Sequence, residues 1–125
     1  MKYLTDLTGI KKAIASIANR GAKLDADIHS AGVSVIAHAD KHNDATLCDS
    51  LVNAMPKGAR KLALVEWMLA YGRIELLDKQ ADKEAIENGR VFRVTKEKKF
   101  DEVGAIGTPW TEYRKEPSVQ TAFDV

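Results

Sequence analysis

Four stretches of the 125-residue chain repeat apolar residues at steps of three or four, and this repetition constrains the fold more than any other feature. Such spacing puts the apolar side chains on one face of a helix, and that face must be buried against another element. Short segments containing glycine, proline or asparagine separate the stretches. The pattern therefore predicts a mainly helical protein with four packed helices joined by short turns.

The turn residues indicate where these helices end. We expect helices over about residues 5–20, 24–42, 45–55 and 57–71. Asp44 is a candidate cap for the third helix, and Gly72 fits the position after the fourth, where a left-handed residue is common. Gly32 lies inside the second helix at a cost of about 1 kcal/mol, which is tolerable if another helix approaches closely. The residues expected in the core or in a subunit interface are Ile10, Ile14, Ile28, Val35, Leu51, Trp67 and Met68.

The pattern changes after the fourth helix. Residues 73–77 (RIELL) are a short run typical of a strand, and residues 90–95 (RVFRVT) alternate with β-branched and aromatic side chains. The charged residues 78–88 between them are expected to form a surface helix or a long turn. The two strands can pair as a small antiparallel ribbon, which needs the helices beneath it for stability.

The end of the chain lacks sustained periodicity, and glycines and prolines interrupt it repeatedly. We expect a short helical turn near residues 101–106 and then an extended, partly disordered tail. The predicted organisation is one helical domain with its ribbon over residues 1–100 and an acidic tail over residues 101–125.

The composition excludes several classes of protein. With 45% hydrophobic and 30% charged residues, the chain is not expected to be disordered. No apolar run approaches the roughly 20 residues that span a bilayer, and no apolar leader is visible. A single cysteine, Cys48, excludes an internal disulfide framework. We therefore expect a soluble intracellular protein.

Enzymatic and metal chemistry have little support. No nucleophile elbow, phosphate-binding loop or dinucleotide motif occurs, so neither an enzyme nor a cofactor is predicted. His38 and His42 are four residues apart and could share one metal ion. A solvated pair near a helix end is the better interpretation, and no metal site is predicted. Cys48 is expected to be a small buried hydrophobe.

The charges are distributed unevenly along the chain. Residues 1–100 contain 17 basic and 13 acidic side chains, a net charge of +4, whereas residues 101–125 contain two and five, a net charge of −3. The overall charge of +1 therefore conceals a basic body and an acidic tail, and this split permits an anionic partner.

The basic segment Arg90–Phe100 (RVFRVTKEKKF) has five basic residues, one acidic residue and two interleaved aromatic rings. An exposed ring beside cations suits sequence-tolerant single-strand binding, because the cations contact phosphates while the ring stacks on a base. The alternative is that Phe92 packs on the helices and the lysines only solubilise a turn. The segment by itself slightly favours that alternative.

A second basic cluster, residues 57–61 (KGARK), opens the fourth helix, where free amides and the helix dipole favour phosphate. The alternative is a charged helix start on the surface. Lys11, Lys12 and Arg20 could extend the basic surface. Phe92 is predicted to stack on a base, and the predicted phosphate-binding residues are Lys57, Arg60, Lys61, Arg90, Arg93, Lys96, Lys98 and Lys99.

The stretch Ile28–Gly72 contains three recognisable parts: IHSAGV, HNDATL, and MPKGARKLAL before a tryptophan-bearing helix. It resembles a segment of small podophage proteins. In size and helical make-up the chain is similar to the single-stranded DNA-binding RNA polymerase cofactor family (Drc-like) of phages that carry a virion RNA polymerase. The resemblance covers about a third of the chain. It implies a virus-encoded protein of the host cytoplasm that forms a homo-oligomer, and it carries over only the PKGARK residues.

These observations lead to two main hypotheses, with a small metal-binding regulator that uses His38 and His42 as a weaker third. The first is a non-enzymatic, sequence-tolerant single-stranded DNA-binding protein that supports phage transcription or replication, with the phage RNA polymerase as a further partner. The second is a phage protein–protein interaction module, such as an adaptor or an inhibitor of a host enzyme, that ignores nucleic acid.

Overall fold

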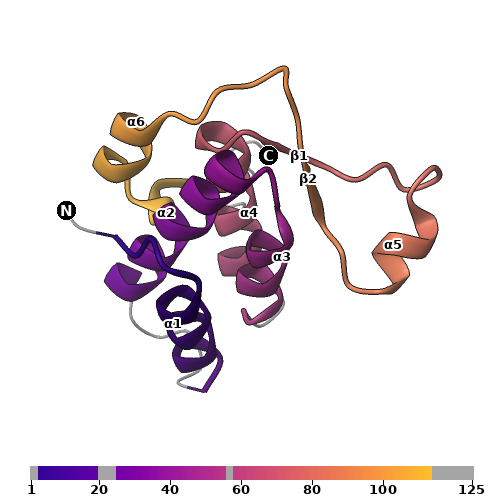
Figure 1. Cartoon of the computed structure of the whole chain (residues 1–125). Helices are drawn as coiled ribbons and strands as arrows, with labels where there is room; N and C mark the ends of the chain where they lie inside the picture. The colour runs from indigo at the N-terminus through magenta and orange to yellow at the C-terminus, as the bar shows by residue number, and fades with distance from the viewer. Residues whose placement is uncertain (1–2, 20–24, 56–57, 114–125) are drawn as a thin grey trace, which may run out of the picture.

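The computed structural model describes residues 3–19, 25–55 and 58–113, and the fold is mainly helical (Figure 1). Its helices are α1 (Leu7–Asn19), α2 (Asp25–His42), α3 (Thr46–Asn53), α4 (Ala59–Tyr71), α5 (Lys83–Glu87), α6 (Glu102–Gly107) and the 3₁₀ helix η1 (Trp110–Tyr113). The strands β1 (Ile74–Leu76) and β2 (Phe92–Val94) pair as an antiparallel ribbon. The predicted fold class, a four-helix core with a two-stranded ribbon, is confirmed.

The helix α2 is central, because α1, α3, α4 and α6 all pack against it. Each of the seven predicted core residues exposes 9% or less of its surface. The predicted close approach at Gly32 is also confirmed, and the approaching group is the ring of Trp67 on α4. A Cβ atom at Gly32 would lie 2.8 Å from Trp67 Cζ3. No helix among the described residues has both the length and the apolar character needed to cross a membrane.

Gly72 ends α4 for a different reason from the predicted one. Its φ of −91° and ψ of 157° are extended rather than left-handed. A Cβ atom there would lie 2.8 Å from the carbonyl oxygen of Met68 and 2.9 Å from Cγ2 of Ile36. The missing side chain, rather than backbone freedom, therefore lets the chain leave α4 close against α2.

Gly72→Ala is expected to lower the free energy of unfolding by about 1–3 kcal/mol, because the added methyl group overpacks against backbone that yields little. Gly107→Ala is the matched control, since a Cβ atom at Gly107 meets nothing within 4 Å. The control is expected to match the wild type or to be more stable by about 0.4–1 kcal/mol. Urea denaturation measures both variants, and equal midpoints would contradict the packing argument.

The turn between α2 and α3 depends on two short polar residues. Asn43 adopts a left-handed φ of 55°, which asparagine tolerates better than most residues. Asp44 accepts hydrogen bonds from Thr46 N at 2.9 Å and Thr46 Oγ1 at 2.8 Å. These bonds lower the pKa of Asp44, the backbone bond being the larger cause. Asp44 therefore holds the start of α3, as predicted, although Ala45 is the residue at the cap position.

The contribution of Asp44 to stability is expected to depend on pH. Because its pKa is lower in the folded state, the contribution is present above the unfolded-state pKa and is lost as pH falls through the folded-state pKa. Asp44→Ala is expected to cost about 1 kcal/mol near neutral pH. The cost should shrink as pH falls from neutral through the folded-state pKa, because the wild-type carboxylate then becomes protonated too. Thermal unfolding of both proteins across this range measures the difference, and a difference that stayed constant would contradict the prediction.

The segment from β1 to β2, residues 74–94, is called the arm because it projects from the helical body (Figure 1). Its strand register pairs Ile74 with Val94, Glu75 with Arg93, and Leu76 with Phe92. Ile74 and Phe92 are completely buried and attach the ribbon to the helices. Helix α5 lies at the far end of the arm and has no buried residue. The predicted surface helix or turn between the strands is thus a short helix.

Residues 101–113, called the strap, fold back onto the helices. The strap contains α6 and η1, and its Trp110 side chain is 1% exposed. The hydrogen bonds that hold it include Asp101 N to Tyr71 O at 2.8 Å, Trp67 Nε1 to Thr108 O at 2.8 Å, and Trp110 Nε1 to Asp25 O at 3.1 Å. The predicted boundary at residue 100 is therefore wrong, because a few large side chains bury the strap without a periodic pattern. The tail expected beyond Tyr113 lies outside the described residues.

The new boundary changes the distribution of charge. The acidic residues of the strap, Asp101, Glu102 and Glu112, belong to the folded body. Residues 1–113 therefore contain 17 basic and 16 acidic side chains, a net charge of +1, and residues 114–125 contain two of each. The predicted contrast between a basic body and an acidic tail disappears. Any attraction for nucleic acid must come from local groups of cations.

Candidate nucleic-acid interface

Arg90, a predicted phosphate ligand, attaches the arm to the body. Its Nε forms an ion pair with Asp49 on α3, and its Nη2 donates to Phe92 O at 2.9 Å. Asp49 is 4% exposed and also accepts from the backbone N of Val91 at 3.0 Å and of Phe92 at 2.8 Å. The buried carboxylate thus satisfies three donors at the start of β2. Asp49 was not predicted, because nothing in the sequence distinguishes it from the exposed polar residues of α3.

Phe92 does not present its ring to solvent. The side chain is completely buried between the ribbon and the helices. The prediction that it stacks on a base is therefore wrong, and the alternative that it packs on the helices is confirmed. The physical reason is that a two-stranded ribbon is stable only when one face is covered, and Phe92 with Ile74 supplies the apolar part of that face.

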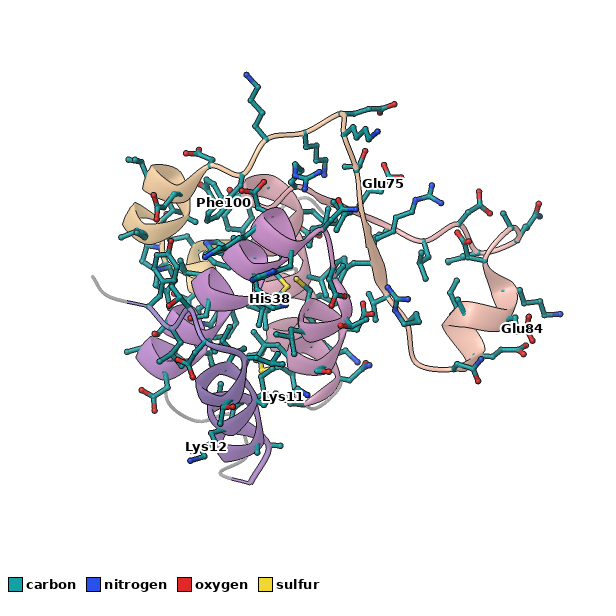
Figure 2. The ribbon with its side chains drawn as sticks, in the orientation of Figure 1. Lys11, Lys12, His38, Glu75, Glu84 and Phe100 are labelled. Atoms are coloured by element: carbon teal, nitrogen blue, oxygen red, sulfur yellow. The ribbon has the colours of Figure 1, made fainter. Side chains whose placement is uncertain are left out.

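Arg93 lies on the opposite, exposed face of the ribbon and is paired within the arm. Its Nε donates to Glu75 Oε2 at 2.6 Å, and its Nη1 contacts Asp82 Oδ2 at 3.5 Å. Glu75 is its direct cross-strand neighbour and is labelled in Figure 2. Half of the Arg93 side chain remains exposed. The arm therefore balances this cation locally, which weakens its attraction for phosphate.

Lys98 is likewise engaged inside the protein. Its Nζ donates to Leu69 O in the last turn of α4 at 3.0 Å and to Ile74 O at the start of β1 at 2.9 Å. Lys96 and Lys99 are exposed on the same connection between β2 and α6. Figure 1 shows that this connection crosses the top of the molecule. Of the lysines in the basic segment, these two are the ones whose position suits a ligand.

The basic cluster at the start of α4 is partly described. Lys57 lies outside the described residues. Arg60 donates from Nη2 to Asp25 Oδ1 at 2.7 Å and lies over the ring of Trp110, 5.0 Å from its centroid. Lys61 is partly exposed. This is the one recorded contact, among the residues described, between a predicted phosphate ligand and an aromatic ring.

The structure does not gather the predicted residues into one surface. Arg90 and Arg93 lie on the arm, Lys96 and Lys99 on the connection across the top, and Arg60 at the start of α4. Figure 2 places Lys11 and Lys12 at the lower end of α1, and both are exposed. Arg20, the third member of that group, lies outside the described residues. A ligand reaching all of these cations would have to run over much of the molecule.

A pocket that the sequence did not predict lies beside Arg60. It has a volume of about 300 Å³ and is lined by Asp25, Ala26, His29, Pro109, Trp110 and Thr111. The pocket exists because the strap closes against the first turns of α2. Its residues are separated by some 80 positions in the chain, so no local pattern could have placed them together. The burial of Trp110 could not be predicted from the sequence, since this residue belongs to no repeating apolar pattern.

The rings of His38 and His42 lie next to each other on α2. His38 and His42 have ring centroids 4.5 Å apart, but the described residues contain no group of three or more histidine, cysteine or acidic side chains able to hold a metal ion. Burial lowers the pKa of His38, and the nearby His42 lowers it further. Cys48 is completely buried, as predicted, and burial raises the pKa of its thiol. A thiol in this state is a poor nucleophile.

Comparison with known proteins identifies no relative: no family model, curated protein or solved structure matches the chain. The resemblance to the podophage cofactor family therefore stays a prediction.

Proposed function

We propose that the protein binds single-stranded DNA without sequence preference and without catalysing a reaction. In this proposal it supports phage transcription or replication inside the infected cell, with the phage RNA polymerase as a further partner. The resemblance over Ile28–Gly72 supports the proposal. Its PKGARK part falls at the start of α4, where the cation–aromatic contact lies.

The observation that carries the proposal is the position of Arg60 over Trp110. Single-strand binding without sequence preference combines cations for the phosphates with a ring for the bases. Arg60 and Trp110 bring these groups together, and Lys61 follows one residue later. Trp110 replaces Phe92 as the candidate aromatic element, and because Trp110 is itself 1% exposed, a base reaches its ring when Arg60 moves aside. Arg60 and Lys61 also provide a local positive charge for phosphate, whereas the folded body as a whole has a net charge of only +1.

The proposal is tested by fluorescence anisotropy with a labelled oligothymidylate across a salt series. If Lys57, Arg60 and Lys61 each contact one phosphate, log K against log salt should have a slope of about −2, because each contact on a single strand contributes about −0.7. Arg60→Gln/Lys61→Gln should reduce the slope by about 1.4 and weaken binding. Lys83→Gln, on α5 of the arm, is the matched control and should change neither quantity. Absence of binding at low salt would overturn the proposal.

The second candidate function is a protein–protein interaction module, and the arm favours it. A hollow of about 230 Å³ in the arm is lined mainly by Leu76, Leu77, Ile86 and Val91, with Lys79 and Arg90 beside them. Leu76 is 50% and Ile86 38% exposed. Exposed apolar groups of this kind are typical of interaction sites. Lys79 in the lining fits a partner segment that is apolar with an acidic flank.

A pull-down separates this candidate from DNA binding. A partner that is retained after nuclease treatment, and is lost with Ile86→Lys, would favour the interaction module. Val103→Lys is the control, because Val103 on α6 is 83% exposed and lies outside the arm. Retention that depends on nucleic acid, or that is equal for the two variants, would remove this candidate.

A further inference from the structure

We infer that the pocket between α2 and the strap binds one base of the single strand, and that Arg60 moves from Asp25 to the neighbouring phosphate when the base enters. This inference rests on the proposed function and assigns it a site. The pocket walls are Ala26, His29, Pro109, Trp110 and Thr111, with Asp25 at the rim.

The shape and chemistry of the pocket fit a flat, largely apolar group. Its volume of about 300 Å³ is at the lower end of the range for small-molecule sites, which are mostly apolar with a few polar groups. Trp110 lines the pocket and is 1% exposed, because η1 packs against α4 and the guanidinium of Arg60 lies over its ring. A base that displaced this guanidinium would gain an aromatic surface on which to stack.

His29 lines the pocket, and its Nδ1 would accept a hydrogen bond from the base once base entry exposes that atom. Its Nε2 lies 3.3 Å from the carbonyl oxygen of Ile106. Because a carbonyl only accepts, Nε2 is the donor in this contact, and in the tautomer with its proton on Nε2 the Nδ1 atom is an acceptor. This Nδ1 is buried and has no hydrogen-bond partner within the part of the chain that the structure describes. Each of the four DNA bases has at least one N–H donor on its pairing edge, so the same acceptor suits every base.

The ion pair between Arg60 and Asp25 can be broken at little cost. This pair is solvent-exposed, with side-chain exposures of 32% and 54%, and exposed ion pairs contribute little to stability. A phosphate offers Arg60 a bidentate acceptor of higher charge. The exchange would uncover Trp110 at the moment when a base is adjacent. A nucleotide supplies both the anion and the flat ring, whereas inorganic phosphate or an apolar molecule supplies only one of them.

The test compares an oligothymidylate with an abasic oligonucleotide of the same length, using a label at one end. Wild-type protein should bind the oligothymidylate about tenfold more tightly, as expected for loss of one stacked base. Ala26→Leu fills the pocket from an exposed helical position, so folding should be unaffected. It should weaken oligothymidylate binding about tenfold and leave abasic binding unchanged, so that the two ligands bind equally. Ala70→Leu, at an exposed position on α4, is the matched control and should preserve the tenfold difference.

The possible results show separately whether the pocket assignment or the proposed DNA-binding function fails. If neither oligonucleotide binds at low salt, the proposed function fails. If both bind and Ala26→Leu preserves the tenfold difference, DNA binding stands and the pocket assignment fails. A second readout is the intrinsic tryptophan fluorescence, which should be quenched by the oligothymidylate in wild type and in Ala70→Leu but not in Ala26→Leu. Equal quenching in all three proteins would also overturn the assignment.

Discussion

Trp67→Ala is expected to lower the free energy of unfolding by about 3–5 kcal/mol. The side chain is completely buried, and its ring covers Gly32 on α2. Its Nε1 donates to the carbonyl oxygen of Thr108 in the strap. Removing the ring therefore leaves a cavity between α2 and α4 and a carbonyl without its donor. Urea denaturation followed by circular dichroism measures the change.

Trp67→Phe separates the two parts of this effect. Phenylalanine retains most of the apolar volume but cannot donate to Thr108, so the expected loss is about 1–3 kcal/mol. The Trp67→Phe substitution should also increase limited proteolysis of the strap more than that of the rest of the chain. A loss below about 1 kcal/mol for Trp67→Ala would contradict the assignment of Trp67 as the central contact of the core.

Asp49→Ala is expected to destabilise the protein by about 3 kcal/mol, because the carboxylate is the common acceptor for three donors at the start of the arm. The two backbone amides of Val91 and Phe92 would be left without an acceptor. Thermal denaturation should show a decrease in Tm of about 10 °C for a chain of this size. Ser50→Ala, at the neighbouring exposed position on α3, is the control and should stay within about 0.5 kcal/mol of wild type.

Arg90→Ala tests whether the ion pair or the backbone bonds dominate. Arg90 is 38% exposed in its side chain, and Asp49 would keep both backbone donors in this variant. We therefore expect a loss of only about 1 kcal/mol. A loss as large as that of Asp49→Ala would instead assign the stability of the arm to the ion pair.

The helical part of the fold followed from local spacing. Apolar residues at steps of three and four located α1 to α4 to within a few residues, and the alternation in RVFRVT located β2. A close helix–helix contact at Gly32 was also predictable, because a glycine inside a helix costs stability that such a contact can offset. That the approaching group is Trp67 was not predictable, since this depends on how α2 and α4 cross.

The candidate site was predicted poorly, and the cause is the same for each residue. A cation in a basic segment can face solvent or a carboxylate that is distant in sequence. Arg90 meets Asp49 from 41 residues away, and Lys98 meets carbonyl groups 24 and 29 residues away. The helical turn near residues 101–106 was predicted and corresponds to α6, but the packing of the strap on the helices was not, because single contacts of Trp67 and Trp110 hold it rather than a repeated apolar face.

The sequence by itself determined the helical class, the order of the main helices and strands, and the apolar faces that the four long helices bury, because amphipathic spacing is a local property that each helix carries alone. Only the tertiary structure decided which charges remain available and where an aromatic ring meets a cation. Those properties depend on pairs distant in the chain, such as Asp25 with Trp110 and Asp49 with Phe92. Because Phe92 is buried and the strap is folded, the candidate interface is the pocket beside Arg60 and not the basic segment Arg90–Phe100.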